Sequence, residues 1–328
     1  MIEVFRDVAG PCLAPSGSVV AVGAFDGLHL GHQGLLAEVR RRASVLGCLN
    51  AAISFEPLPR AYFSRRPLPR LGSVRDKVEG MGAAGIERLL LLRFNHALTA
   101  MSGEDFVRKV LVERLRAREV WVGGDFRFGH KRGGDFALLE SMGADLGFSA
   151  RAMPPVKCDG ERVSSSRIRE FLAAGDFASA AKLLGRPFAI GGRVARGNRL
   201  GSELGYPTAN IHLRRRASPV DGVFAVRVGI DGEPPARPGV ASLGVRPTVN
   251  KVREPLLEVH LFDFDGDLYG RRIETAFVAK LRDELKFDGV DALVAQMHED
   301  ATAARRILAT HPASAHAIDP RVIHERNS

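Results

Sequence analysis

GAFDGLHLGHQ, residues 23–33, decides the fold of the first half of this chain. A short apolar run at residues 18–22 stops at Gly23, and helix-compatible sequence resumes at His32 with apolar residues at helical spacing. Glycines between a strand and a helix let backbone N–H groups approach phosphate oxygens, and a helix N-terminus favours negative charge. The stretch therefore predicts a phosphate site where a buried strand passes into a helix.

Strand and helix patterns alternate from this stretch to about residue 124. Apolar, β-prone runs lie at residues 18–22, 50–55, 88–94 and 120–122. Helical patterns lie between them at residues 32–46, 73–82 and 102–115. Such alternation indicates βαβ units and a parallel sheet, so the N-terminal half is predicted to be α/β and Rossmann-like. Ligands bind at the carboxyl ends of such strands, so the loops at Gly23 and Gly123 are expected to open onto one crevice.

The pattern changes near Gly185. Helical sequence at 164–184, broken at Gly175, precedes it, and β-prone runs follow at residues 189–194, 222–230, 239–243 and 256–264. Short strands separated by Gly, Pro and Asp predict an antiparallel barrel or sandwich, closed by an amphipathic helix at about 290–308. We expect domains at residues 1–184 and 187–310, followed by a loose polar tail at 311–328.

Length and composition narrow the function classes. A chain of 328 residues has room for about two domains, and a net charge of +9 with a pI near 9.9 favours anionic ligands: nucleotides, phosphorylated metabolites or nucleic acid. The cysteines, Cys12, Cys48 and Cys158, are too scattered for a disulfide framework or a metal site. With no signal pattern and no apolar run of about 20 residues, we expect a soluble, cytoplasmic protein.

Two histidines mark the first candidate site. His29 and His32 are three residues apart and share one face of a first helical turn, where their imidazoles can donate to a triphosphate and its departing pyrophosphate. A pair of surface histidines beside a flexible loop is the alternative. The preceding strand, the Phe-Asp-Gly turn and the His-x-Gly-His spacing together favour the anion site.

These residues resemble the nucleotidyltransferase superfamily that carries the HIGH motif. VSSSRIR at 163–169 fits its second signature, and GGDFRFGHKRGGD at 123–135 is similar to the members that adenylylate flavins. Residues 124–131 approach a Walker A motif but lack adjacent Gly-Lys-Ser/Thr, which rejects that interpretation. The resemblance implies catalytic roles for His29 and His32. It implies phosphate contacts from Gly23, Phe25, Asp26, Gly27, Gly31, Ser164, Ser165 and Arg167, and flavin contacts from Asp125, Phe126, Arg127 and Phe128.

A second glycine-marked stretch lies past the middle of the chain. GGRVARGNRLG at 191–201 precedes LGYPTAN at 204–210, where glycines permit close phosphate approach and the Thr208 hydroxyl suits Mg²⁺ bridging phosphates. Taken alone, the stretch also reads as a turn entering a strand. Glu258 alternates with apolar Leu257 and Val259 and faces the other side of its strand.

The PTAN sequence resembles riboflavin kinase, and later pieces at residues 244–248, 257–264, 267–270 and 281–287 agree. The resemblance implies that Glu258 takes the proton from the ribityl 5′-hydroxyl, that Thr208 holds Mg²⁺ and that Arg282 contacts the flavin. It implies ATP contacts from Gly192, Gly197, Gly201, Gly205, Pro207 and Asn210.

From about Val19 to Arg306 the chain is similar to the bifunctional bacterial riboflavin kinase/FAD synthetase family. The resemblance implies phosphorylation of riboflavin to FMN, then adenylylation of FMN to FAD by a second ATP, with Mg²⁺ as cofactor. The chain departs from the family pattern at Ala24, Leu58, Ser166 and Val249.

Two other functions remain open at this point. One is another His-x-Gly-His transferase, against which the β-rich second half with its PTAN sequence argues. The other is a basic nucleic-acid-binding protein, but the arginines are distributed along the chain and no RRM, KH or helix-turn-helix signature appears. The partners expected are riboflavin, FMN and ATP, with no membrane. The sequence leaves the oligomeric state open, a homo-oligomer included.

Overall fold

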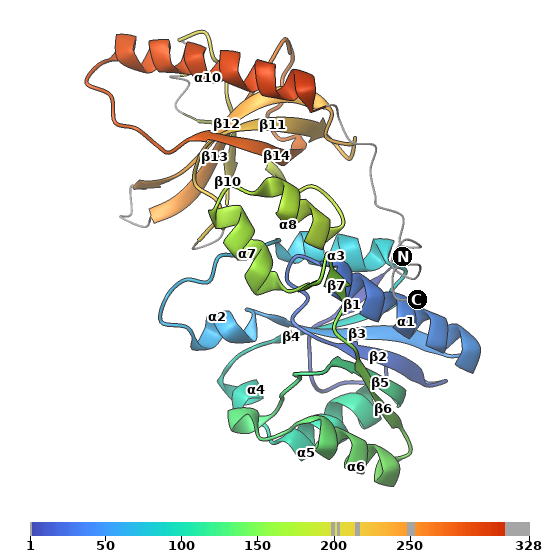
Figure 1. The fold of residues 1–328 in the computed structure, drawn as a ribbon. Helices are drawn as coiled ribbons and strands as arrows, with labels where there is room; N and C mark the ends of the chain where they lie inside the picture. The colour runs from blue at the N-terminus through green and yellow to red at the C-terminus, as the bar shows by residue number, and fades with distance from the viewer. Residues whose placement is uncertain (1, 198–200, 202–203, 214–216, 248–252, 312–328) are drawn as a thin grey trace. The chain divides into compact units, whose positions relative to one another are not determined.

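The computed structural model describes residues 2–197, 201, 204–213, 217–247 and 253–311, drawn in colour in Figure 1. The chain forms two compact units: Met1–Leu68 with Gly72–Ser164, and Pro69–Leu71 with Ser165–Ser328. Residues 312–328, most of the predicted tail, and Val249 lie outside the described residues. Within the described residues, no helix combines the length and apolar character that crossing a membrane requires.

The first unit is built on a parallel sheet, which confirms the α/β prediction. Its six strands are ordered β1-β4-β3-β2-β5-β6, and every pairing is parallel. The strands are β1 Glu3–Phe5, β2 Ser18–Val22, β3 Leu49–Glu56, β4 Arg88–Arg93, β5 Ala117–Gly123 and β6 Ser149–Met153. Because β2 pairs with β5 through Val22 and Val122, the loops that follow these strands start side by side, as expected from Gly23 and Gly123.

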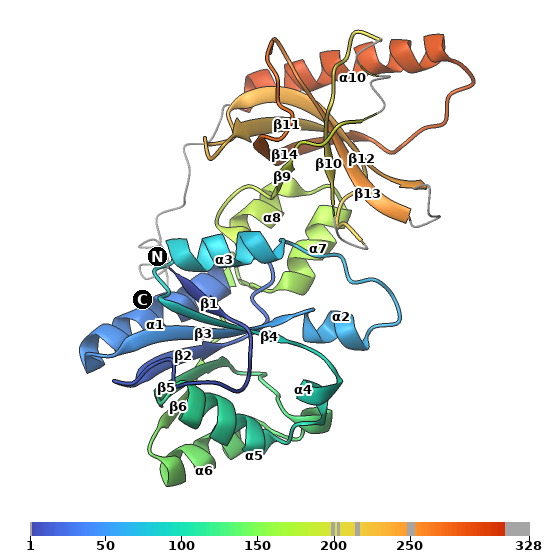
Figure 2. The same cartoon turned by 180° about the vertical axis from the view of Figure 1, so that it is seen from behind.

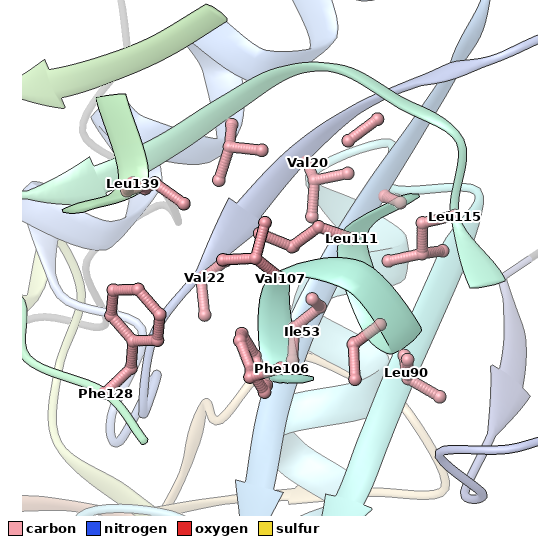
Figure 3. Close-up of a cluster of buried hydrophobic side chains, with 14 of the residues drawn as sticks. Val20, Val22, Ile53, Leu90, Phe106, Val107, Leu111, Leu115, Phe128 and Leu139 are labelled. Carbon is pink, nitrogen blue, oxygen red and sulfur yellow. The ribbon is translucent and has the colours of Figure 1, made fainter. Parts of the chain in front are cut away.

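Helices cover both faces of this sheet (Figures 1 and 2). They are α1 Leu30–Leu46, α2 Pro59–Phe63, α3 Val74–Ala83, α4 His96–Ala100, α5 Gly103–Phe106, the π-helix η1 Val107–Arg114, the 3-10 turn η2 His130–Arg132 and α6 Phe136–Leu146. One core cluster joins α1 and α3 to the sheet through residues such as Leu36 and Met81. Figure 3 shows the other, where Phe106, Val107 and Leu111 pack onto Val20 and Ile53.

Sequence patterns missed several pieces of this unit. The helix predicted at 102–115 is divided: Ser102 caps α5 as expected, but the following turns are π-helical. Helix α6 and strand β6 had not been anticipated. Strand β6 lies at the sheet edge with exposed or half-buried residues throughout, so it lacks the apolar run that marks a buried strand.

The second unit is a nearly closed antiparallel barrel, which confirms the other half of the fold prediction. Its six strands are ordered β10-β13-β12-β11-β14-β9. They are β9 Ala189–Arg193, β10 Ala209–His212, β11 Gly222–Ile230, β12 Arg237–Pro247, β13 Arg253–Leu261 and β14 Arg272–Arg282. A bridge between Ala195 and Asn210 brings the two edges together, with Ala195 N–H donating to the Asn210 carbonyl at 2.8 Å. Helix α10 Val290–Thr310 packs on the barrel, as predicted.

Two short helices belong to the barrel unit by their contacts. These are α7 Ser165–Ala173 and α8 Phe177–Leu184, separated at Gly175, whose φ of 77° ends the first helix as predicted. Phe177 stacks on Phe277 of β14 at 5.9 Å and meets Phe224 of β11 edge-on at 5.8 Å. Both helices lie in the second compact unit, which takes up the chain again at Ser165, and these ring contacts pack α8 against the barrel.

The remaining elements are a small hairpin of β7 Lys157–Cys158 and β8 Glu161–Arg162.

Candidate active sites

The turn between β2 and α1 has an unusual backbone. Phe25, Gly27 and Leu28 all have positive φ, at 49°, 83° and 44°. Left-handed backbone is costly for residues other than glycine and persists only where neighbouring structure enforces it. The Phe25 ring and the Asp26 side chain are buried, so the phosphate contact expected from Phe25 would have to come from its backbone.

The two histidines lie face to face at the start of α1. His29 is the N-cap residue, and its Nδ1 accepts a hydrogen bond from the backbone N–H of His32 at 3.3 Å. The two rings stack with centroids 3.7 Å apart. A methyl group at Gly31 would lie 3.2 Å from the His29 ring, so the glycine leaves room for this arrangement. The pair predicted from spacing is therefore brought together at a helix N-terminus, where anions are favoured.

His32 is held in its neutral form. Burial, and then the charges of His29 and Lys77, place the pKa of His32 well below its ordinary value of 6.5. Its Nδ1 is buried and makes no hydrogen bond within the described part of the chain. A neutral imidazole offers one N–H donor, so His32 can donate one hydrogen bond to a phosphate oxygen at neutral pH.

The loop after β5 carries the expected flavin residues in two different settings. Phe126 is half-buried and stacks on Phe128 at 5.3 Å, while Phe128 itself is buried in the core and visible in Figure 3. Arg127 pairs with Asp135 at 2.6 Å, and Asp125 pairs with Arg162 at 3.0 Å. Phe126 is therefore the partly exposed aromatic residue of this loop, and it stacks on the buried Phe128.

The second signature falls at the division between the units. The Val163 carbonyl would lie 3.8 Å from a methyl group at Gly31, so the residue before Ser164 approaches the first turn of α1. Ser164 is the last residue of the first unit, and Ser165 opens helix α7 in the second. Within that helix, Arg167 pairs with Glu170 at 3.1 Å and its guanidinium covers the Phe171 ring at 4.1 Å.

In the barrel unit, two histidines anchor the segment before Thr208. The Tyr206 hydroxyl shares a 2.6 Å hydrogen bond with Nδ1 of His298 on α10. The ring of His260, on β13, donates from Nδ1 to the Pro207 carbonyl at 2.9 Å. Asn210 then donates from its side-chain amide to the Thr208 carbonyl at 3.2 Å. The segment that carries Thr208 is therefore fixed from both sides.

Strand register brings Glu258 beside this segment. Asn210 of β10 pairs with Glu258 of β13, and Glu258 pairs on its other side with Ser242 of β12. Directly opposed residues in antiparallel strands have Cβ atoms about 5 Å apart on one face of the sheet. Three polar side chains thus form a row across adjacent strands, while Leu257 and Val259 are buried on the opposite face.

The glycines expected at this site are needed for different structural reasons. Methyl groups at Gly197 and Gly201 would collide with Asn210 and with the Tyr206 carbonyl, so both lie against the 206–210 segment. Gly192 faces Ile211 across the barrel wall, where a methyl group has no room. Gly205 is exposed, with a φ of 83°. The requirement at Gly192 therefore follows from barrel packing.

The residues around Thr208 suit Mg²⁺. Thr208 carries a side-chain hydroxyl, Asn210 follows it two residues later, and Mg²⁺ prefers hard oxygen ligands shared with substrate phosphates. Within the described residues, no group of three or more His, Cys, Asp or Glu side chains could hold a metal ion. The fit is therefore to a cation that shares its coordination with nucleotide phosphates.

Arg282, expected to contact flavin, is engaged by helix α10. Its guanidinium pairs with the buried carboxylate of Asp300 at 2.7 Å, and its Nη1 donates to the Asp283 carbonyl at 2.9 Å. Val223 of β11 pairs with Ser242 on one side and with Arg282 on the other. Arg282 therefore continues, across the strands, the row that contains Glu258 and Ser242. Arg282 ties β14 to α10 at this end of the barrel.

Sequence reasoning missed the residues that hold these sites in place. They are Ser54, Lys77, His260, His298 and Asp300, each of which bonds to a residue or segment described above. One signal was available: Lys77 lies four residues before Met81 on the buried face of α3, where an apolar residue is the norm.

Comparison with known proteins covers both units. The model of the FAD synthetase family matches residues 13–167, and that of the riboflavin kinase family matches residues 184–308. A curated protein of Pseudomonas fluorescens named bifunctional riboflavin kinase/FMN adenylyltransferase is 45% identical over 293 residues, covering 89% of this chain and 94% of its own. Its namesake in Escherichia coli (strain K12) is 40% identical over 315 residues, covering 95% and 100%.

One solved structure is similar over nearly the whole chain. It is described as a macrolide-efflux protein from Streptococcus pneumoniae, covers 93% of this chain and 98% of its own, and has a TM-score of 0.77 at 29% identity.

Proposed function

This chain belongs to the family of bifunctional riboflavin kinases/FMN adenylyltransferases, and on that premise we propose which residues perform each reaction. It phosphorylates riboflavin to FMN with one ATP and adenylylates FMN to FAD with a second, releasing pyrophosphate. The family match over both halves replaces the two alternatives raised by the sequence, another His-x-Gly-His transferase and a basic nucleic-acid-binding protein.

Riboflavin phosphorylation is assigned to the barrel unit, with Glu258 as general base. The riboflavin 5′-hydroxyl attacks the γ-phosphorus of ATP, its proton passes to the Glu258 carboxylate, and ADP leaves. The pairing of Glu258 with Asn210 carries this assignment, because it sets the base beside the segment that ends in Thr208 and Asn210. Gly197, Gly201, Gly205 and Pro207 shape the backbone of the ATP site around that segment.

Thr208 would hold Mg²⁺ together with the ATP phosphates, with Asn210 as an ATP contact beside it. Mg²⁺ bound there would supply neutralisation of phosphate charge. The role of this chain is to present the Thr208 hydroxyl, which it does by fixing the Pro207 carbonyl through His260 and the Tyr206 hydroxyl through His298.

FMN adenylylation is assigned to the parallel-sheet unit, at the turn after β2. An oxygen of the FMN phosphate attacks the α-phosphorus of ATP, and pyrophosphate leaves without a proton transfer or covalent intermediate. His29 and His32 donate to the phosphate oxygens on which charge develops, as preorganised groups do in other transfers. Backbone groups of residues 23–27 and Gly31, with Ser164, Ser165 and Arg167, are the further phosphate contacts, and Phe126 is the flavin contact of the loop after β5.

The two activities define the domains that we propose, residues 1–184 for adenylyl transfer and 187–310 for the kinase. The separate family matches at 13–167 and 184–308 support this division. No disulfide joins the three cysteines, all of which lie in the described part of the chain, and this suits the reducing cytoplasm that we propose as the location.

One experiment tests the assignment. The chain is incubated with ATP and either riboflavin or FMN, with Mg²⁺ or with a chelator, and FMN and FAD are followed by chromatography. We expect riboflavin to pass through FMN to FAD, FMN to give FAD directly, and the chelator to stop riboflavin phosphorylation. Formation of FMN at the full rate in the chelator would remove Mg²⁺ and Thr208 from the proposal.

A further inference from the structure

Helix α3 buries a lysine that the proposed chemistry does not use. The helix begins with a capping box, in which Ser73 and Asp76 satisfy each other's backbone N–H groups. Its buried residues are Lys77 and Met81, one turn apart on the face toward the sheet. Only 4% of Lys77 is exposed. Lysine is almost never fully buried, because removing an ammonium from water is costly unless hydrogen bonds compensate.

The Lys77 ammonium lies among oxygens of the turn after β2 and of strand β3. Its Nζ donates to the Ala24 carbonyl at 2.8 Å and to the Ser54 hydroxyl at 2.9 Å, with the Phe55 carbonyl at 3.4 Å. The Ser54 hydroxyl donates in turn to the same Ala24 carbonyl at 3.1 Å. A helix, a strand and a turn are thereby tied together at the carbonyl of Ala24.

The turn held in this way is the one that leads into the two histidines. Phe25 follows Ala24 directly and has the left-handed backbone that surrounding structure must enforce. Its buried ring lies 5.1 Å from the ring of His32. A shift of the Ala24 carbonyl would therefore move Phe25, and with it the support of His32.

We propose that Lys77 is a positioning residue for FMN adenylylation: it fixes the Ala24 carbonyl, and through the turn that follows it holds His29 and His32 where they meet the phosphates. This inference rests on the assignment of FMN adenylylation to the parallel-sheet unit. The Lys77 charge is also one of the causes, after burial and His29, that lower the pKa of His32. The family departure at Ala24 fits this role, because the contact is made by the backbone and not by the side chain.

Lys77→Met in the full chain is the first test, because methionine has similar length and no charge or donor. Displacement of catalytic groups by about 1 Å lowers rates by up to about 10²-fold, so we expect kcat for FAD formation from FMN to fall by about 10- to 10²-fold per folded molecule. The KM for ATP should change by no more than a few-fold. Riboflavin phosphorylation by the same preparation should stay within about two-fold, since that chemistry belongs to the other unit.

Lys109→Met is the matched control. Lys109 lies in the same unit, its side chain is half-exposed, and it pairs with Asp105 at 3.3 Å on the protein surface. We expect this variant to make FAD at the wild-type rate. A lysine that served stability alone would lower the unfolding temperature in Lys77→Met while leaving kcat per folded molecule unchanged, and that result would overturn the proposal.

Ser54→Ala keeps the test decisive if Lys77→Met does not fold. The change removes the hydroxyl that bridges Lys77 and Ala24 but leaves the ammonium and its own bond to the carbonyl. We expect a loss of a few-fold in kcat for FAD formation, smaller than for Lys77→Gln, which loses the charge and keeps an amide donor. Wild-type kcat in both Ser54→Ala and Lys77→Gln would refute the positioning role.

His32→Ala separates this inference from the assignment beneath it. If His32→Ala forms FAD at the wild-type rate, the assignment of adenylylation to this turn fails. If His32→Ala loses activity while the Lys77 and Ser54 variants keep it, the assignment stands and the role of Lys77 falls.

Discussion

The two proposed phosphate sites are built in different ways. In the parallel-sheet unit, the donors lie on one continuous stretch, where strand β2 passes through a strained turn into helix α1. In the barrel unit, the groups come from separate strands and meet because register sets Asn210, Glu258 and Ser242 in one row. The first site depends on the backbone conformation of a single turn, and the second depends on the pairing of three strands.

This difference predicts which reaction each substitution impairs. A change at the turn should disturb adenylyl transfer and leave the barrel row intact, and a change in the row should do the reverse. The predictions for Glu258 and His32 measure both reactions, so that a loss shared by the two would break the comparison.

The largest effect is expected for Glu258→Gln. The amide keeps the size of the side chain but cannot accept the proton of the ribityl hydroxyl, and loss of a general base lowers rates by about 10²–10⁴. Riboflavin phosphorylation should fall by that factor, whereas FAD formation from supplied FMN should be near normal. The measurement is paired on one preparation by chromatography. Phosphorylation within a few-fold of wild type would point to another base.

Removing helix α8 from the barrel should have the next largest effect. A fragment of residues 165–328 retains the packing of Phe177 on Phe224 and Phe277, and a fragment of residues 187–328 loses it. Loss of a buried phenylalanine lowers the free energy of unfolding by about 3–5 kcal/mol. Urea unfolding of the two fragments, followed by circular dichroism, measures the difference. Equal midpoints would show that α8 adds nothing and that the domain begins at Pro187.

His32→Ala tests the parallel-sheet unit in the same way. Loss of one preorganised donor lowers the rate of transfer by about 10²–10³. FAD formation from FMN should fall by that factor, and riboflavin phosphorylation should persist. His96→Ala, at an exposed histidine of the same unit outside the proposed site, is the control. A parallel loss of both activities in folded protein would contradict separate sites.

The sequence predicted the first proposed site more completely than the second. The turn was predictable because the His-x-Gly-His spacing, the glycines and the preceding apolar strand are contiguous, and strand β2 begins and ends at the predicted residues, Ser18 and Val22. The barrel class was predictable from short runs between turns. Register was not, because the pairing of Asn210 with Glu258 joins residues far apart in the chain, and β10 has only four residues.

Two further features lay beyond sequence patterns. Strand β14 went unrecognised because Arg272, Glu274, Lys280 and Arg282 interrupt its apolar residues, while its actual partners, β9 and β11, are set by tertiary pairing. The burial of Lys77 and its bond to Ala24 likewise depend on how α3 packs over the sheet. Local patterns assign residue types to a site, but they do not show which side chains support it.

The neutral state of His32 predicts a pH dependence confined to the first unit. The pKa of His32 is lowered in the folded protein. Below about pH 6.5, His32 therefore binds a proton in the unfolded chain but stays neutral in the folded chain. The free energy of unfolding should fall as pH decreases through that window, by at most about 1.4 kcal/mol per pH unit. Urea unfolding followed by Trp121, the one tryptophan in the chain, reports on this unit. An unchanged slope in His32→Ala would assign the dependence to other groups.

The smallest effect is expected for Tyr206→Phe in the barrel. The change removes the hydroxyl that bonds Nδ1 of His298, and one such hydrogen bond contributes about 1 kcal/mol, equivalent to about five-fold in rate. Riboflavin phosphorylation should fall by a few-fold and no more, because His260 still holds the Pro207 carbonyl. His298→Ala should give a similar loss, and the double variant little beyond either, since both remove one interaction. Fully additive losses would mean that Tyr206 and His298 act independently and that α10 does not position Thr208.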